Sequence, residues 1–271
     1  MCFVVEKQLI FEEKPKGCSD NVSVVIPTAN RGELLNICVN SVLEQSFKPF
    51  EIIIVDNGNQ RCYQNQGVPQ SVSIIKTTPN IGASKARNAG LHKVKTKYVA
   101  FLDDDDVWDK DYLKLLMKEI CSNKCDVVVG SLYRKRTSDG ACVPYKKFPS
   151  KLNNQRKVYY SNPGFGGQNF LINTNFLSNI GGFEETFVGS EDRDLAARII
   201  ENNGIIIPVP NAIAILYDHA DTRNRHNKRI KGLLQFISRH KKYMTQKEML
   251  FAYIKLLDHL QKIIRRKYIG I

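Results

Sequence analysis

Long hydrophobic runs are missing from this sequence of 271 residues. A membrane-spanning helix needs about 18 consecutive apolar residues, and no stretch of the chain reaches that length. The N-terminal residues up to Lys14 mix charges with short apolar pieces and offer no small-residue cleavage site, so they do not resemble a signal peptide. We therefore expect a cytoplasmic protein, with any membrane contact peripheral and on the inner face of the plasma membrane.

Two kinds of short motif are also missing. The seven cysteines contain no Cys-x-x-Cys pair, and no second pair completes a zinc site with Cys121 and Cys125. Reduced thiols in a reducing cytosol are the expectation, with a metal pair at these two cysteines as the alternative. No Gly-x-Gly-x-x-Gly follows the first apolar run, which argues against a dinucleotide-dependent oxidoreductase.

Positive charge is abundant but unevenly distributed. Residues 223–271 contain 14 Lys and Arg against two acids, Glu248 and Asp258, which gives a net charge of +12. The other 222 residues contain 26 bases and 25 acids, a net charge of +1. The C-terminal segment therefore presents a basic surface suited to an anionic partner, whereas the rest of the chain is electrically balanced.

Apolar runs of strand length alternate with helical patterns along the chain. Continuous apolar runs bounded by turn residues predict buried strands, and apolar residues three and four apart predict helices. An α/β fold follows, with a mainly parallel central sheet covered by helices on both faces. Strands are predicted at 22–27, 51–55, 72–76, 98–102, 126–132 and 212–217, helices at 32–46, 83–93, 109–121, 193–203 and, as two or three helices, 228–268, and a loop region over the site at 134–163.

Polar residues gather at the carboxyl ends of three predicted strands. These ends carry Pro27-Thr28, Asp56-Asn57 and the run from Asp103 to Asp106. Ligands of such sheets bind beyond the carboxyl ends of the strands, so the three clusters are expected to converge on one binding edge.

The run of four aspartates is the strongest chemical signal. In an extended chain Asp103 and Asp105 would point to the same side, where two carboxylates about 4 Å apart repel by roughly 1–4 kcal/mol. A divalent cation relieves that repulsion, and oxygen ligands select Mg²⁺ or Mn²⁺. The alternative is a solvated acidic turn in which Asp106 or Asp109 caps the helix at 109–121.

A series of motifs runs between residues 21 and 220: VVIPTANR (24–31), the helix through Ser41 and Gln45, EIIIVDNG (51–58), NIGASKARNAG (80–90), YVAFLDDDDVW (98–108), GGFEE (181–185) and SEDRDLAAR (190–198). In this order the set resembles the inverting glycosyltransferases of family 2, which have the GT-A fold. Asn57 departs from the family pattern, in which a second Asp is frequent at this strand end.

The resemblance implies roles for individual residues. Asp192 is the expected general base that deprotonates an acceptor hydroxyl, with Glu191 as the alternative base; Asp192 could also cap the helix that starts at Arg193. Mn²⁺ or Mg²⁺ is the expected cofactor, with Asp105 and Asp103 as ligands and His219 either a further ligand or a structural residue. The nucleotide-sugar donor is expected to contact Pro27, Thr28, Asn30, Arg31, Asp56, Asn57, Asn80, Lys85, Arg87, Asn88, Asp103 and Asp104, with Asp56 accepting a hydrogen bond from the base.

A few further positions have weaker signals. Gln168 and Asn169 are candidates for a donor or acceptor contact, and Trp108 is expected to pack in the core. The glycine-rich stretch at 164–167 either admits a ligand close to the backbone or forms a plain turn.

The basic C-terminal segment allows three interpretations. It could lie on anionic lipid, with Leu233, Phe236, Leu250, Ile254, Leu257 and Ile263 facing the bilayer. It could be a solvated helical pair that caps the catalytic core. Nucleic-acid binding is the third interpretation, although no recognition motif accompanies the basic residues.

These observations predict an N-terminal extension at 1–20, a GT-A domain at 21–222 and a basic helical segment at 223–271. The expected function is inverting transfer of a sugar from a nucleotide-diphosphate donor, a UDP-hexose or UDP-N-acetylhexosamine. The expected acceptor is a hydroxyl of a glycan or lipid-linked glycan in surface polysaccharide synthesis, such as O-antigen or capsule. The alternatives are a sugar-nucleotide-binding protein without catalysis and a basic nucleic-acid-binding protein.

Overall fold

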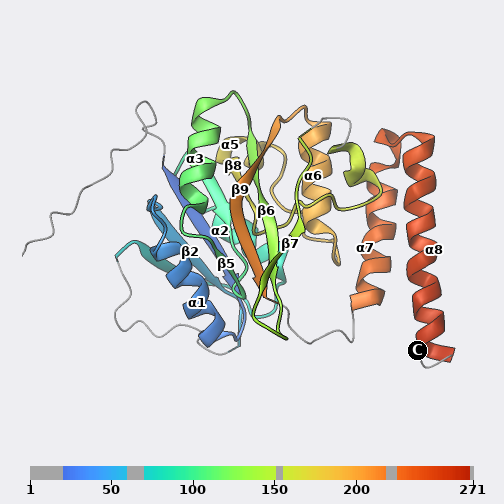
Figure 1. The fold of residues 1–271 in the computed structure, drawn as a ribbon, viewed down its shortest axis with the longest axis horizontal. Coiled ribbons are helices and arrows are strands. Elements are labelled where there is room, and N and C mark those ends of the chain that lie inside the picture. The colour runs from blue at the N-terminus through green and yellow to red at the C-terminus, as the bar shows by residue number, and fades with distance from the viewer. Residues whose placement is uncertain (1–20, 60–69, 151–154, 218–224, 269–271) are drawn as a thin grey trace, which may run out of the picture.

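A computed structural model describes residues 21–59, 70–150, 155–217 and 225–268, and the side chains of these residues except 225–229 and 263–268. Its strands form one sheet with helices on both faces, and a pair of helices stands at one end (Figure 1). Among the described residues the order of the strands is β3-β2-β1-β4-β8-β6-β9-β5, and β7 pairs with β6. The predicted α/β architecture is confirmed.

The first half of the sheet is parallel. It consists of β1 (Val22–Thr28), β2 (Glu51–Asp56), β3 (Val72–Lys76) and β4 (Tyr98–Phe101). Their β-branched runs suit a strand that is buried on both faces. Along β1 the side chains alternate, with Val24 and Ile26 in one hydrophobic core and Val25 in the other.

The second half of the sheet is mixed. β8 (Phe170–Asn173) lies antiparallel between β4 and β6 (Val127–Lys135), and β6 runs parallel to the long strand β9 (Ile206–Tyr217). β5 (Asp106–Trp108) pairs antiparallel with β9, and β7 (Cys142–Lys146) with β6. The parallel arrangement predicted from the apolar runs therefore holds for β1 to β4 and for the pair of β6 and β9.

Helices from both halves cover the sheet. α1 (Gly32–Leu43) and α3 (Tyr112–Ser122) pack on one face, while α2 (Ala83–Leu91), α5 (Thr174–Asn179) and α6 (Glu191–Glu201) pack on the other. At Gly90 a Cβ atom would lie 2.3 Å from a methyl group of Val25, so only glycine lets α2 approach β1 this closely.

The C-terminal segment is a helical pair, as predicted. α7 (Arg225–His240) and α8 (Gln246–Tyr268) are joined by a short 3-10 helix, η2 (Lys241–Tyr243), and lie side by side beyond α6 (Figure 1). α7 packs on α6, and α8 packs on α7 and on η1 (Arg156–Tyr159). No helix in the described part of the chain is long and apolar enough to cross a membrane.

Two side chains of α7 correct the lipid-facing prediction. Leu233 is 3% exposed and Phe236 is fully buried, because both pack into the protein interior. Ile263 is among the residues whose side chains are not described. Leu250, Ile254 and Leu257 of α8 are exposed, as that interpretation requires.

The predicted caps and loops need correction. α3 starts at Tyr112 with Asp111 as its N-cap, so neither Asp106, which lies in β5, nor Asp109 caps it. α6 starts at Glu191 after Ser190, so Asp192 lies inside the first turn and is not the cap. The expected loop region at 134–163 also contains the end of β6, all of β7 and η1.

The cysteine prediction is wrong at one position. Cys121 is disulfide-bonded, whereas Cys38, Cys125 and Cys142 are free thiols. A metal pair of Cys121 and Cys125 is therefore excluded, and the cysteines give no support for a reducing compartment.

Candidate active site

The carboxyl ends of β1, β2 and β4 meet at one edge, as the strand order predicts. The backbone N–H of Asn57 donates to the carbonyl of Thr28 at 2.9 Å, and the Thr28 hydroxyl donates to Asp104 Oδ2 at 2.7 Å. Asp56 is 5% exposed and accepts a hydrogen bond from the backbone of Gly58. Residues separated by up to 76 positions in the sequence are thus joined at this edge.

The aspartate run makes a turn. The chain does not stay extended after β4, because the N–H of Asp106 donates to the carbonyl of Asp103 at 3.1 Å. The period-two argument for Asp103 and Asp105 is therefore wrong, although the carboxylates remain clustered. Burial and the nearby carboxylates of Asp103 and Asp105 raise the pKa of Asp106 to about 9.

Arg31 balances part of this negative charge. Its guanidinium lies 3.1 Å from Asp104 Oδ1 and also pairs with Asp105. Burial, together with the charges of Asp105 and Asp103, raises the pKa of Asp104, while Thr28 and Arg31 oppose that rise. The side chains of Asp103 and Asp105 stay 31% and 20% exposed, so both remain accessible to a ligand.

Arg87 of α2 links the aspartate run to α6. Its Nη2 atom lies 2.5 Å from Asp103 Oδ1, and its Nη1 atom lies 3.9 Å from Glu191 Oε1. Burial alone would lower the pKa of Arg87, but the carboxylates of Asp103, Asp192 and Glu191 outweigh burial and raise it. Nε and Nη1 are buried and have no hydrogen-bond partner among the described residues, so Arg87 has spare capacity to bind an anion.

Asp192 faces the same region from the first turn of α6. Its Oδ1 atom is shielded from solvent and finds no hydrogen-bond partner of normal geometry in the described part of the chain. Burial, followed by the charge of Glu191, raises the pKa of Asp192 to about 7, while Arg87 lowers it. A carboxylate of that pKa is suited to accept a proton near neutral pH.

Gly167 lies between these two side chains. A Cβ atom on this residue would lie 2.8 Å from Arg87 Nη2 and 3.2 Å from Asp192 Oδ1. A side chain at this position would therefore require Arg87, and to a smaller extent Asp192, to shift. Sequence reasoning left this stretch open between a ligand approach and a plain turn; the structure places Gly167 against the candidate catalytic groups.

Left-handed backbone conformations mark the start of the site helices. Asn30 (φ 58°) precedes α1, Asn80 (φ 60°) precedes α2 and Ser190 (φ 70°) immediately precedes α6. Among the described non-glycine residues only Asn203 also has a positive φ. Such strained residues cluster at functional sites, where the surrounding structure holds them in place.

Several predicted contact residues have structural partners. The Asn88 amide bonds to the backbone of Phe183 and to Glu185, which ties α2 to the GGFEE segment. Asn80 donates its backbone N–H to the carbonyl of Asn57 at 2.7 Å, and Pro27 lies within β1. The roles of these residues in nucleotide binding stay predictions, and His219 lies outside the described residues.

The weaker candidates are mostly parts of the interior. Trp108 stacks on Tyr112 with ring centroids 4.5 Å apart and donates to the Gln168 carbonyl, which confirms its packing role. Asn169 bonds to the backbones of Gly130, Gly164 and Gly166 and so braces the glycine-rich turn.

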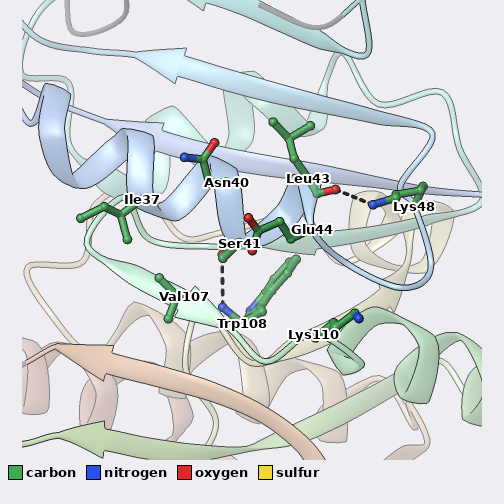
Figure 2. Close-up of a pocket in the computed structure, with 9 residues that line it drawn as sticks. All are labelled: Ile37, Asn40, Ser41, Leu43, Glu44, Lys48, Val107, Trp108 and Lys110. Atoms are coloured by element: carbon green, nitrogen blue, oxygen red, sulfur yellow. Dashed lines mark hydrogen bonds between the residues drawn. The ribbon is translucent and has the colours of Figure 1, made fainter. Parts of the chain in front are cut away.

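Two hollows lie near these elements. The larger, of about 710 Å³, lies between α1 and the β5 segment, with Ile37 and Ser41 on one side and Trp108 on the other, and none of the predicted site residues lines it (Figure 2). The smaller, of about 230 Å³, lies at the start of α2 and is lined by Lys85, Glu185 and Glu191. The smaller hollow therefore adjoins the candidate site, and the larger one is separate from it.

The donor set at the aspartate run fits a hard divalent cation. Asp103 and Asp105 provide carboxylate oxygens that stay partly exposed. The described residues contain no group of three or more His, Cys, Asp or Glu side chains that could complete a metal site. Mg²⁺ sites commonly use one or two carboxylates together with substrate phosphates, so a diphosphate would have to supply the remaining oxygens.

A family comparison supports this interpretation of the site. Residues 23–181 match the model of Glycosyl transferase family 2. The chain belongs to glycosyltransferase family 2. The matched region contains β1 except its first residue, β2, the aspartate run and Arg87, while Asp192 lies beyond its end.

Individual relatives are glycosyltransferases. Glycosyltransferase GlyA of Streptococcus pneumoniae is 32% identical over 45% of this chain and 18% of its own length. The putative teichuronic acid biosynthesis glycosyltransferase TuaG of Bacillus subtilis is 35% identical over 38% of this chain and 43% of its own. The glucosyltransferase WfgD of Escherichia coli is 25% identical over 68% and 71%. The chain thus spans less than half the length of GlyA and TuaG.

Solved structures show the same fold. Staphylococcus aureus TarS superposes with a TM-score of 0.60 at 21% identity, over 80% of this chain and 40% of that one. GalNAc-T7 with UDP, GalNAc and Mn²⁺ gives a TM-score of 0.65 at 16% identity, over 81% and 48%. The GT-A fold expected from the motifs is confirmed.

Proposed function

We propose that this protein is a metal-dependent inverting glycosyltransferase that uses a nucleotide-diphosphate sugar. The observation that carries the proposal is the position of Arg87. Its guanidinium lies between Asp103, which we assign to the nucleotide side, and Glu191 and Asp192, which we assign to the acceptor side. Two of its nitrogen atoms are buried without hydrogen-bond partners in the described residues.

The two sides of the site suit the two halves of the reaction. Cleavage of the donor places negative charge on a leaving diphosphate, which the free N–H groups of Arg87 would stabilise. Asp103 and Asp105 would hold Mn²⁺ or Mg²⁺, which supplies further electrostatic stabilisation to the diphosphate. Asp192 would remove the proton of the acceptor hydroxyl, and a single displacement then inverts the anomeric carbon.

The relatives suggest which donor and acceptor to test. WfgD is named as a transferase from UDP-Glc to a GlcNAc-diphosphoundecaprenol, and GalNAc-T7 was solved with UDP, GalNAc and Mn²⁺. TuaG is named for teichuronic acid biosynthesis. We therefore propose a UDP-hexose or UDP-N-acetylhexosamine as donor, and a hydroxyl of a glycan or lipid-linked glycan in surface polysaccharide synthesis as acceptor.

The proposal is tested by incubating the purified protein with a panel of nucleotide sugars and with Mn²⁺, Mg²⁺ or EDTA. The expected result is hydrolysis or binding of at least one UDP-sugar that EDTA abolishes. Binding without hydrolysis or transfer to any glycan would favour the non-catalytic alternative. Salt-sensitive binding of RNA or DNA, without any UDP-sugar signal, would favour the nucleic-acid alternative.

A further inference from the structure

The outer helix α8 carries an apolar face that the described part of the chain leaves uncovered. Leu250 and Leu257 are each 58% exposed, Ile254 is 51%, Tyr253 is 48% and Leu260 is 39% exposed. Their spacing of three and four residues places these five side chains on one side of the helix. α8 is the outermost element of its side of the molecule (Figure 1).

The opposite side of α8 already supplies what folding requires. Ala252 is fully buried and packs with Leu233 and Ile237 of α7, and Met249 and Leu256 are partly buried against the same cluster. A surface helix of a soluble protein needs only one such apolar stripe. A second stripe of large exposed side chains is the pattern of an interaction surface, since single exposed apolar residues are common but contiguous ones are not.

The charges beside this face point to an anionic partner. Lys241, Lys242 and Lys247 are exposed along η2 and α8. The two acids of the region are both paired within the chain, Glu248 with Arg156 and Asp258 with Lys262. Three more bases, Arg265, Arg266 and Lys267, follow in the sequence of α8.

The same charges argue against a second copy as the occupant. A symmetric dimer through this face would bring the same patch together twice, so its lysines would meet lysines. An anionic bilayer instead offers an apolar layer for the leucines and phosphate groups for the lysines. The helix of 23 residues is long enough to lie flat over about 35 Å of such a surface.

We propose that α8 binds the surface of an anionic lipid bilayer through Tyr253, Leu250, Ile254, Leu257 and Leu260, with the neighbouring lysines at the phosphate level. The helix lies in the interface and does not span the membrane. This surface is distinct from the candidate active site and needs neither donor nor metal. The proposal therefore stands or falls separately from the transferase function.

The test is co-sedimentation of the full chain with vesicles of phosphatidylcholine, with and without phosphatidylglycerol. The expected result is binding to the mixed vesicles and at least several-fold weaker binding to phosphatidylcholine alone. Ile254→Gln and Leu257→Gln should each weaken binding by about tenfold. Lys247→Gln should weaken vesicle binding by about fivefold, because each Lys or Arg near an anionic surface contributes about that factor to the affinity.

A matched control tests whether the loss of any exposed leucine, rather than of one on this face of α8, weakens vesicle binding. Leu234 of α7 is 49% exposed but lies on another helix, so Leu234→Gln should leave vesicle binding unchanged. All variants alter exposed side chains, and thermal unfolding checks that they stay folded. Failure of the wild-type chain to bind mixed vesicles would overturn the proposal, and so would unchanged binding of the Ile254 and Leu257 variants.

Light scattering without lipid tests the competing occupant. A monomer supports the proposal. A dimer that Ile254→Gln and Leu257→Gln dissociate would show that a second copy covers the face, and would overturn the proposal.

Discussion

Helix α6 contributes to two charged clusters that differ in how many of their buried polar atoms have hydrogen-bond partners. At its first turn, Asp192 and the facing Arg87 keep buried atoms without hydrogen-bond partners in the described structure. Two residues further on, Asp194 bonds to His240 at 2.9 Å and to Arg198 at 2.7 Å. His240 is fully buried, and its second nitrogen bonds to Glu201 at 2.7 Å.

The difference separates a binding site from a structural ion cluster. In the His240 cluster both ring nitrogens face carboxylates, which only accept hydrogen bonds when ionised, so the ring carries two protons. In the Arg87 cluster the capacity to donate and accept is left over, at a cost in stability that a bound substrate would recover. We interpret the His240 cluster as the contact that holds α7 against α6, and the Arg87 cluster as the proposed reaction centre.

The largest effect is expected from Asp192→Asn. If this carboxylate is the base, turnover of the UDP-sugar should fall by about 10²–10⁴-fold while donor affinity stays within a few-fold. Steady-state kinetics and calorimetric donor titration measure the two quantities. Asp258→Asn, on the exposed side of α8, is the control and should change neither. Unchanged turnover in Asp192→Asn would show that Asp192 is not the base.

The next effect is expected from Arg87→Gln. Loss of the guanidinium removes the proposed stabilisation of the leaving diphosphate and leaves three carboxylates facing one another. Turnover should fall by about 10²–10³-fold, because an oriented charge at the reaction centre is lost. Arg136→Gln is the matched control, since Arg136 is half exposed and forms an exposed ion pair with Asp139. Equal effects of the two substitutions would contradict the role of Arg87.

His240→Gln should act on stability rather than chemistry. Removing one partner of a buried ion cluster costs about 3–5 kcal/mol of unfolding free energy, measured by denaturant titration. The exposed His92 provides the control, and His92→Gln should change stability by less than about 0.5 kcal/mol. Under conditions where the His240 variant is folded, its turnover should stay within a few-fold. A large loss of turnover without loss of stability would move His240 into the reaction centre.

The stability contributed by His240 should also depend on pH. Burial opposes its charged form, but the bonds to Asp194 and Glu201 outweigh burial and raise the pKa of His240 above its usual value. The stabilisation is therefore complete below about pH 6.5 and is lost as the pH rises through the folded-state pKa. Wild-type unfolding free energy should approach that of His240→Gln at alkaline pH, and a constant difference between them would contradict a protonated ring.

The smallest effect is expected from Gly167→Ala. The new methyl group would lie 2.8 Å from Arg87 Nη2 and would displace a side chain that Asp103 also holds. Turnover should fall by about tenfold because the charged group is misplaced, with little change in thermal unfolding. Full activity would show that the position of Arg87 tolerates adjustment.

Much of the fold was predictable because its strands are continuous apolar runs. Residues 72–76 match β3, and the ends of β1 and β2 were missed by one residue. β5, β7, β8 and the first half of β9 were not predicted: β5 and β8 are short, β8 follows a glycine-rich turn, and β7 lies in the turn-rich stretch interpreted as a loop. The places of β5 and β8 depend on pairing with β9 and β4, which are distant in sequence.

The gathering of polar residues at one edge of the sheet was predictable where residue type and strand end coincide, as at Asp56 and Asp103, and their roles in binding stay predictions. Residues whose burial or partners depend on the tertiary structure were harder to predict. The helical period of α7 does not reveal which of its apolar sides is covered, so Leu233 and Phe236 were placed on the wrong surface. His240 gave no signal at all, because its two carboxylate partners lie on another helix.

The most direct test of the central claim is the pH dependence of kcat/KM for the proposed UDP-sugar donor, compared between wild type and Asp192→Asn. With the pKa of Asp192 raised to about 7, the base is ionised above that pH and protonated below it. Wild-type activity should therefore fall about tenfold per pH unit below pH 7, and the residual activity of Asp192→Asn should lack this limb. An acid limb that persists unchanged in the variant would show that another group deprotonates the acceptor.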